Sequence, residues 1–353
     1  MTLQDRIRKI APYVPGEQPQ DRDIIKLNTN ECPYPPSPRF AEAYSSLSPA
    51  DFRRYPDTEA HELVQAISDI YGIPVEQIFV GVGSDEVLAF AFQAFFTGGG
   101  RLLFPDITYS FYPVWAELYH IPFTAVPTDQ DFRIRAEDYL GVDDACGVIF
   151  PNPNAPTGIA EPRSFVERIL AGNPDKVVIV DEAYVDFGGE TALPLLEKYE
   201  NLMVIRTCSK SRAMAGLRIG YAFGSRQLID AVKAIKFSFN SYTLNHASII
   251  PGAAAIRDTV YFDEICSRII KTRERMAQGL KKLGFVFPPS SANFIFAKHE
   301  RIPGREIQEK LREKKIYVRR WDAPRISDYM RITVGTDEET DRLLEELGRI
   351  TAC

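Results

Sequence analysis

Short runs of β-branched and aliphatic residues recur along the first two thirds of the chain, separated by stretches with helical spacing. Five of these runs are typical of buried strands, at 78–83, 101–106, 147–154, 176–184 and 201–207. Helical patterns lie between them at 84–96, 164–172 and 193–200. Strands that alternate with helices predict an α/β fold: a large domain with a mostly parallel sheet that is flanked by helices.

The last ninety or so residues have a different pattern. A long helical stretch at 261–284 leads to strand patterns at 285–289, 291–298, 316–320 and 330–335, with a further helix at 305–315. A final helix is predicted from Thr336, because Glu339 follows it at the spacing of a capping box. We therefore expect a smaller α+β domain at 259–353. The large domain would span 29–258, and the segment 1–28 would join the small domain.

Composition and charge limit the classes of partner. The 353 residues are 45% hydrophobic and 25% charged with a formal net charge of −6, so no general positive field favours nucleic acid. The four histidines lie far apart, which predicts no metal site. Five cysteines without a CxxC pair suit reduced thiols. The charged first ten residues and the short apolar run 87–96 predict a cytoplasmic protein without a membrane partner.

A group of cations follows the predicted strand at 201–207. Lys210, Arg212 and Arg218 come directly after it, interleaved with Ser209. A solvated loop would explain them, but cations beside a core are costly unless something pairs with them. The alternative is a site for an anion together with a reactive amine.

Two other strand ends also carry polar residues. Asp181 closes the run KVVIVD, where it could cap a helix or form an ion pair with a protonated ring nitrogen. Ser84 and Asp85 follow a Gly-Val-Gly turn and open a helix, whose backbone N–H groups can bind an anion. The turn is not a dinucleotide fingerprint, because Glu86 stands where the third glycine is required.

Together these residues meet the requirements of pyridoxal phosphate, which needs a lysine, an acid opposite its ring nitrogen and donors for its phosphate. Lys210 supplies the amine and Asp181 the acid. The donors for the phosphate are expected from Thr207, Ser209, Arg218 and the backbone near Ser84 and Asp85. Gly216 is expected to bend the chain so that Arg218 returns toward the anion.

The ordered motifs resemble the fold-type I pyridoxal-phosphate aminotransferases, and within them the histidinol-phosphate aminotransferases. The resemblance covers nearly the whole chain: APY at 11–13, LNTNE at 27–31, RYPD at 54–57, GSDE at 83–86, PDITYS at 105–110, NPNAPTG at 152–158, DEAYVDF at 181–187, TCSKSRAMAGLRIGY at 207–221 and MRITVGT at 330–336.

The resemblance implies a role for individual residues. Lys210 would form the covalent link to the cofactor, Asp181 would pair with its ring nitrogen, Tyr184 would bond its phenolic oxygen and Tyr109 would stack on its ring. Tyr55 would reach the cofactor phosphate of a partner subunit, which implies a homodimer with shared active sites.

The resemblance also implies the substrate side of the pocket. Arg331 would hold the carboxylate of the amino-acid partner, and Arg319 would meet the substrate phosphate. Tyr13 and Asn30 lie in motifs that line the substrate pocket. The family commonly has NNPTG where this chain has Ala155, so Asn154 or Tyr184 is expected to bond the phenolic oxygen instead.

The implied reaction is transamination between L-histidinol phosphate and 2-oxoglutarate, with glutamate as a product, in histidine biosynthesis. Three alternatives stay open at this stage. They are a phosphothreonine-type decarboxylase on the same scaffold, an aminotransferase for aromatic amino acids, and a non-catalytic phosphate-binding α/β protein in which Lys210 is only an anion ligand.

Overall fold

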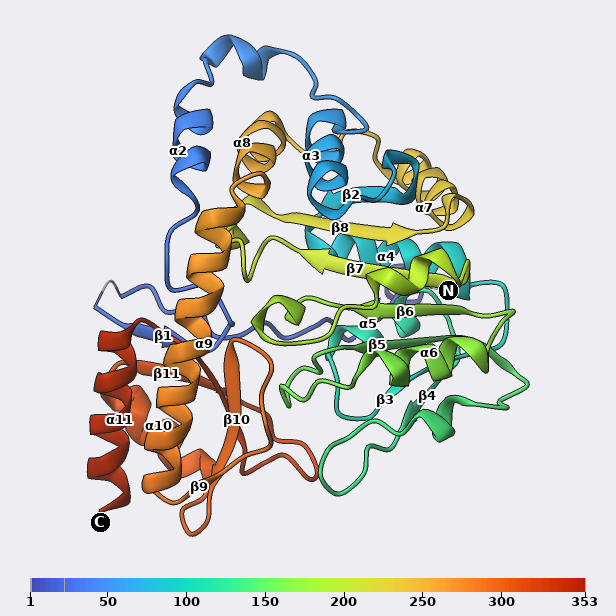
Figure 1. Cartoon of the computed structure of the whole chain (residues 1–353). Helices are drawn as coiled ribbons and strands as arrows, with labels where there is room; N and C mark the ends of the chain where they lie inside the picture. The colour runs from blue at the N-terminus through green and yellow to red at the C-terminus, as the bar shows by residue number, and fades with distance from the viewer. Residues whose placement is uncertain (1, 22, 353) are drawn as a thin grey trace.

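The computed structural model describes residues 2–21 and 23–352, which form two β-sheets (Figure 1). The larger sheet has, within these residues, seven strands in the order β2-β8-β7-β6-β5-β3-β4. Their bounds are β2 Ile78–Val82, β3 Arg101–Pro105, β4 Phe123–Val126, β5 Ala145–Pro151, β6 Val177–Asp181, β7 Leu202–Thr207 and β8 Ile219–Gly224. Only β8 runs antiparallel to its neighbours in this part of the chain, which confirms the mostly parallel sheet.

Helices cover both faces of the larger sheet. One face packs against α4 (Gly83–Phe96), α5 (Phe111–Leu118) and α7 (Arg226–Phe239), and the other against α3 (His61–Tyr71), α6 (Arg163–Ala171) and α8 (His246–Ile256). In β6 the side chain of Ile179 enters the first core, whereas Val178 and Val180 enter the second. Successive strand residues point to opposite faces, so a strand between two cores is apolar throughout.

The smaller sheet has the order β1-β11-β12-β10-β9 among the described residues. Its strands are β1 Ile25–Leu27, β9 Phe285–Val286, β10 Phe294–His299, β11 Ile316–Arg320 and β12 Met330–Thr333, and its helices are α9 Thr259–Lys282, α10 Gly304–Glu313 and α11 Asp337–Thr351. The N-terminal segment reaches this sheet through β1, which pairs with β11 in parallel. The domain boundaries at 28/29 and 258/259 stay an interpretation.

Two local predictions had different outcomes. The capping box of α11 is confirmed: Thr336 N donates to Glu339 Oε2 at 2.8 Å, and Glu339 N donates to Thr336 Oγ1 at 3.2 Å. The helix expected at 193–200 is only a 3₁₀ turn, Leu193–Glu197, with proline in its first turn. After Glu197 the chain continues into β7 instead of forming further helical turns.

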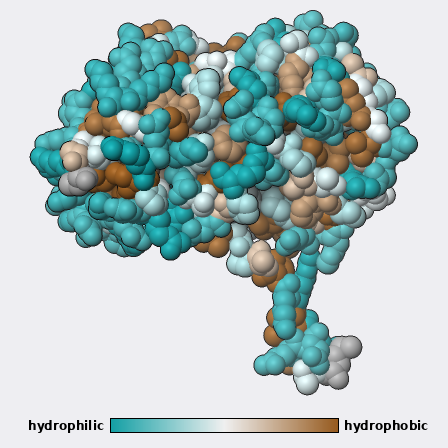
Figure 2. All heavy atoms as spheres, turned by 90° about the horizontal axis from the view of Figure 1, so that it is seen from below, coloured by the Kyte–Doolittle hydropathy of each residue, from teal (hydrophilic) through white to brown (hydrophobic). Residues whose placement is uncertain are grey.

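The first residues leave the body of the protein. Helix α1 (Leu3–Arg6) lies in this N-terminal segment, of which Leu3, Ile7 and Val14 are exposed, and Figure 2 shows an arm that projects from the body. Helix α2 (Pro38–Ser45) instead packs against α8. None of the helices in residues 2–21 and 23–352 is both long enough and apolar enough to cross a membrane.

Candidate active site

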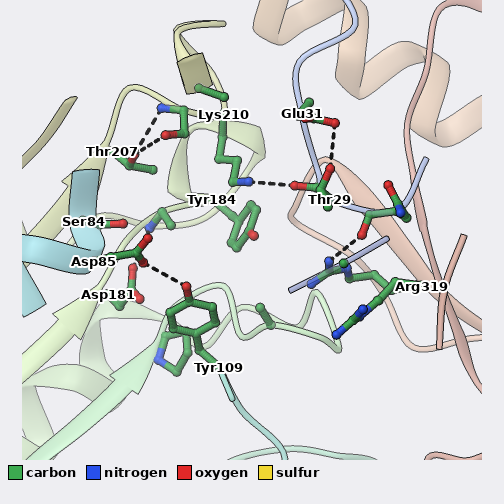
Figure 3. Close-up of a pocket in the computed structure, with 18 of the residues that line it drawn as sticks. Thr29, Glu31, Ser84, Asp85, Tyr109, Asp181, Tyr184, Thr207, Lys210 and Arg319 are labelled. Atoms are coloured by element: carbon green, nitrogen blue, oxygen red, sulfur yellow. Dashed lines mark hydrogen bonds between the residues drawn. The ribbon is translucent and has the colours of Figure 1, made fainter. Parts of the chain in front are cut away.

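A cavity of about 380 Å³ lies where the larger sheet meets the smaller one (Figure 3). The last residue of β6 is Asp181, which lies in the cavity wall, and the loop after β7 brings Lys210 there. Strands β11 and β12 bring Arg319 and Arg331. Tyr13 of the N-terminal segment closes part of it. Parallel strands place their carboxyl ends at one edge of a sheet, where such loops converge.

One end of the cavity is built for an anion. Helix α4 begins at Gly83, whose φ of 75° suits glycine, so Ser84 and Asp85 lie in its first turn. The backbone of β8 approaches this turn closely, since a Cβ on Gly220 would lie 2.2 Å from Ser84 N. Glycine at 220 therefore lets the helix start sit against the sheet.

Arg218 reaches this end from the loop after β7. Its Nη2 lies 3.1 Å from Asp85 Oδ2, and its Nη1 lies 3.4 Å from Ser209 Oγ. The Thr207 hydroxyl donates to Ser209 Oγ at 3.0 Å. Arg218 itself has a left-handed φ of 55°. The turn that the sequence assigned to Gly216 is thus made at Arg218, and Gly216 has open space around it.

Lys210 lies between the two ends of the cavity. Its Nζ donates to the carbonyl oxygen of Thr29 at 2.9 Å, a contact that joins the loop after β7 to the segment after β1 (Figure 3). Desolvation, with Arg331 nearby, lowers the pKa of Lys210 to about 8. The shift brings the pKa of the amine closer to neutral pH, which favours the neutral form that a lysine base or nucleophile requires.

Asp181 is a buried acid with a specific donor. The hydroxyl of Tyr112, in α5, donates to Asp181 Oδ2 at 3.0 Å, and Ala183 N donates to Oδ1 at 3.1 Å. Burial raises the pKa of Asp181 to about 6 in spite of these bonds. A cationic ring nitrogen placed here would favour the ionised carboxylate.

Sequence reasoning missed Tyr112 and Thr29. Tyr112 falls in the aromatic run FYPVW of α5, where its spacing is that of a core residue, and it is indeed fully buried. Thr29 acts through its backbone carbonyl, for which a side chain gives no signal. Only the spatial order of the strands shows that α5 begins beside the end of β6.

Three of the predicted tyrosines, Tyr13, Tyr109 and Tyr184, lie in the cavity wall. Asn30 Nδ2 donates to the Tyr184 hydroxyl oxygen at 2.9 Å, so Asn30 acts behind Tyr184 and not at the surface of the cavity. The Tyr109 hydroxyl donates to Asp85 Oδ1 at 2.9 Å. Tyr13 stacks on Phe111, with ring centroids 4.3 Å apart.

Arg319 and Arg331 form the second cationic end. Arg319 donates to the carbonyl oxygens of Val14 and Pro15 at 3.0 and 3.1 Å. Arg331 Nη2 donates to the carbonyl oxygen of Asn28 at 3.0 Å, and its buried Nε has no partner. Within the described part of the chain, neither guanidinium pairs with a carboxylate.

Two predicted cofactor residues do not line this cavity. Tyr55 is 77% exposed and stacks on Tyr242 at the surface. Asn154 is buried behind the wall, where its Nδ2 donates to the Ile107 carbonyl oxygen at 2.9 Å, and Ala155 occupies the wall instead. The expected bond from Asn154 to a cofactor thus has no support in this arrangement.

Comparison with known proteins identifies the family. The family model "Aminotransferase class I and II" matches residues 22–347. Histidinol-phosphate aminotransferase 2 of Burkholderia lata is 50% identical over 351 residues, covering 99% of this chain and 98% of that protein. Histidinol-phosphate aminotransferase of Aromatoleum aromaticum is 50% identical over 98% of this chain and 97% of its own length.

Solved structures show the same fold. The histidinol-phosphate aminotransferase of Sinorhizobium meliloti, determined in complex with pyridoxal-5'-phosphate, superimposes with a TM-score of 0.85 at 23% identity, covering 94% of this chain and 92% of that one. The fold is therefore that of the fold-type I aminotransferases, as the motifs predicted. The chain belongs to the class I and II aminotransferase family, in which its relatives of about half identity are histidinol-phosphate aminotransferases.

Proposed function

We propose that this aminotransferase moves the amino group between L-histidinol phosphate and 2-oxoglutarate, with pyridoxal phosphate as its cofactor, in the cytoplasm. The observation that carries the proposal is that Lys210 lies in one cavity with two groups of cationic and polar side chains, one around Arg218 and one around Arg319 and Arg331. One end suits the cofactor phosphate. The other suits the phosphate or carboxylate of a substrate.

The residues present fit pyridoxal phosphate. Ser84, Thr207, Ser209 and Arg218 line one end of the cavity beside the start of α4, a donor set suited to a phosphate. The buried Asp181, whose pKa is raised by burial, suits a protonated ring nitrogen, because a cation there would stabilise its ionised form. When bound, this cofactor supplies an aldehyde that captures amines and a ring that accepts the electron pair left at the substrate Cα.

The side chains divide the remaining work. Lys210, as a neutral amine, would take the proton from the substrate Cα and deliver it to the carbon that carried the cofactor's aldehyde oxygen, so that the proton does not return to Cα. Asp181, fixed by Tyr112, would hold a proton at the ring nitrogen. Tyr184, fixed by Asn30, would donate to the phenolic oxygen.

The substrate phosphate is assigned to Arg319 and Arg331. Both are cations without a carboxylate partner among the described residues, and planar guanidinium groups bind phosphate and carboxylate oxygens in pairs. Phosphate and the glutamate carboxylate can therefore use the same end in the two halves of the reaction. The names of the relatives do not favour a decarboxylase, an aromatic aminotransferase or a non-catalytic protein.

The substrate assignment is tested with the cofactor-loaded protein in single-turnover experiments. L-Histidinol phosphate should convert the bound cofactor to its amine form, and L-histidinol should need a concentration at least about 100-fold higher, because the charge-assisted bonds to phosphate are lost. Phenylalanine and phosphothreonine serve as comparison substrates. Equal efficiency for histidinol and its phosphate would contradict the assignment.

We also propose a homodimer in which Tyr55 serves the partner's cofactor phosphate. Tyr55 lies outside the cavity of its own subunit, and its ring is exposed together with that of Tyr242. The exposed apolar side chains of Leu3, Ile7 and Val14 in the N-terminal segment would gain cover from a second subunit. A monomeric mass in solution at micromolar concentration would contradict this arrangement.

A further inference from the structure

Trp321 touches both cations at the substrate end of the cavity. The guanidinium carbon of Arg319 lies 5.3 Å from the centroid of the Trp321 ring, and that of Arg331 lies 5.2 Å from it. Arg331 also lies 5.4 Å from the centroid of Phe294. Two arginines that repel each other are therefore held together by the ring of Trp321, because the negative faces of aromatic rings attract cations.

The rings stabilise the two charges without cancelling them. The hydrogen-bond acceptors of Arg319 and Arg331 are backbone carbonyls of Val14, Pro15 and Asn28, which carry no net charge. A carboxylate in the place of Trp321 would hold the arginines equally well, but it would neutralise one of them and compete with an anionic ligand. The arrangement keeps two positive charges available.

Trp321 is itself fixed by apolar packing. It follows directly on β11 and packs against an apolar cluster made of Ile107, Phe132, Ile159, Phe296 and Ile326. The cluster joins residues of the loops of the larger sheet to residues of the smaller one. Its packing holds the indole ring in the position at which both arginines meet it.

We propose that Trp321 is a positioning residue that holds Arg319 and Arg331 as an uncancelled pair of charges, so that this end of the cavity selects a doubly charged phosphate monoester over a singly charged carboxylate. This role of Trp321 rests on the proposed function for the identity of the substrate. The selection between anions follows from the two charges being held side by side at this end of the cavity. A phosphate monoester carries between 1.5 and 2 negative charges at pH 7, on the order of twice the charge of a carboxylate.

The test measures the affinity of the cofactor-loaded protein for methyl phosphate and for acetate by calorimetry at pH 7.5. Trp321→Leu should weaken methyl phosphate binding about tenfold, since two cation–ring contacts are lost, and acetate binding only about twofold to threefold. Trp321→Phe keeps a ring and should recover most of the affinity. Tyr329→Leu is the matched control, because Tyr329 packs on the same cluster but stacks on Phe296.

The outcomes separate this inference from the proposed function. Unchanged methyl phosphate binding in Trp321→Leu, an equal loss for both anions, or the same loss in Tyr329→Leu would overturn the role of Trp321. So would wild-type protein that binds the two anions equally well. Wild-type protein that prefers methyl phosphate but fails to use L-histidinol phosphate would instead overturn the substrate, and the role of Trp321 would stand.

Discussion

Replacing Lys210 with alanine should abolish turnover, with a loss of at least about 10⁴-fold in kcat. Lys210 lies between the two anion-binding ends, and desolvation with the nearby Arg331 lowers its pKa to about 8. Alanine removes both the amine that would link to the cofactor and the base that would move the proton at Cα. The measurement is steady-state transamination at saturating substrate.

Lys210→Arg serves as the matched control. It keeps a positive charge at this position but cannot act as a neutral amine near pH 8, so it should be about as inactive as the alanine variant. Both variants should still bind the cofactor phosphate, because Thr207, Ser209 and Arg218 remain. Activity above about one hundredth of the wild-type rate in either variant would contradict the role of Lys210.

Replacing Asp181 with asparagine should lower kcat about 10²-fold to 10³-fold in the loaded enzyme. The amide cannot pair ionically with a protonated ring nitrogen, and breaking a buried ion pair costs several kcal/mol. Asp181→Glu keeps the charge and should retain more activity, although it disturbs the bond from Tyr112. If the asparagine and glutamate variants are equally active, the charge at 181 is not what matters.

In cofactor-free protein at neutral pH, Asp181→Asn should be more stable than wild type, although the same substitution lowers kcat in the loaded enzyme. Burial raises the pKa of Asp181 from 3.8 to about 6, so between these values the folded protein holds a proton that the unfolded chain has lost. The free energy of unfolding therefore falls as pH rises through this window, by about 3 kcal/mol in total. Asp181→Asn removes this dependence.

Urea unfolding of cofactor-free protein at pH 4.5 and pH 7.5 checks the expectation. From pH 4.5 to pH 7.5 the free energy of unfolding of Asp181→Asn should rise relative to that of wild type. Adding the cofactor at pH 7.5 should make wild type the more stable of the two proteins. If the free energies of unfolding of wild type and variant differ by the same amount at both pH values, the burial of Asp181 does not destabilise the protein.

The sequence was informative wherever local chemistry determined the structure. Ile179 and its neighbours form an uninterrupted apolar run, and the structure buries it between two cores. Several site residues lie at or just beyond the ends of strands, and parallel strands bring such residues together. They are Lys210, Asp181, Tyr184 and Arg218. Lys210, Asp181 and Arg218 were found because charged residues are unusual beside a core, whereas the role of Tyr184 came from the family resemblance.

Contacts that depend on the arrangement of distant segments could not be predicted. Tyr112 and Trp321 are aromatic residues at positions that suit packing, and only their neighbours in space show that one donates to Asp181 and the other faces two arginines. Asn154 and Ala155 are adjacent in sequence, and the backbone of their loop decides which of them enters the wall. Tyr55 has no role within its own subunit's cavity.

The most direct test of the account is the visible spectrum of cofactor-loaded protein before and after L-histidinol phosphate is added without 2-oxoglutarate. The account predicts that the yellow absorption is lost as the cofactor takes up the amino group, and that 2-oxoglutarate restores it. A spectrum that is unchanged by L-histidinol phosphate but bleached by an aromatic amino acid would contradict the assignment of the second anion-binding end. Protein that shows no such absorption with added pyridoxal phosphate would contradict the site itself.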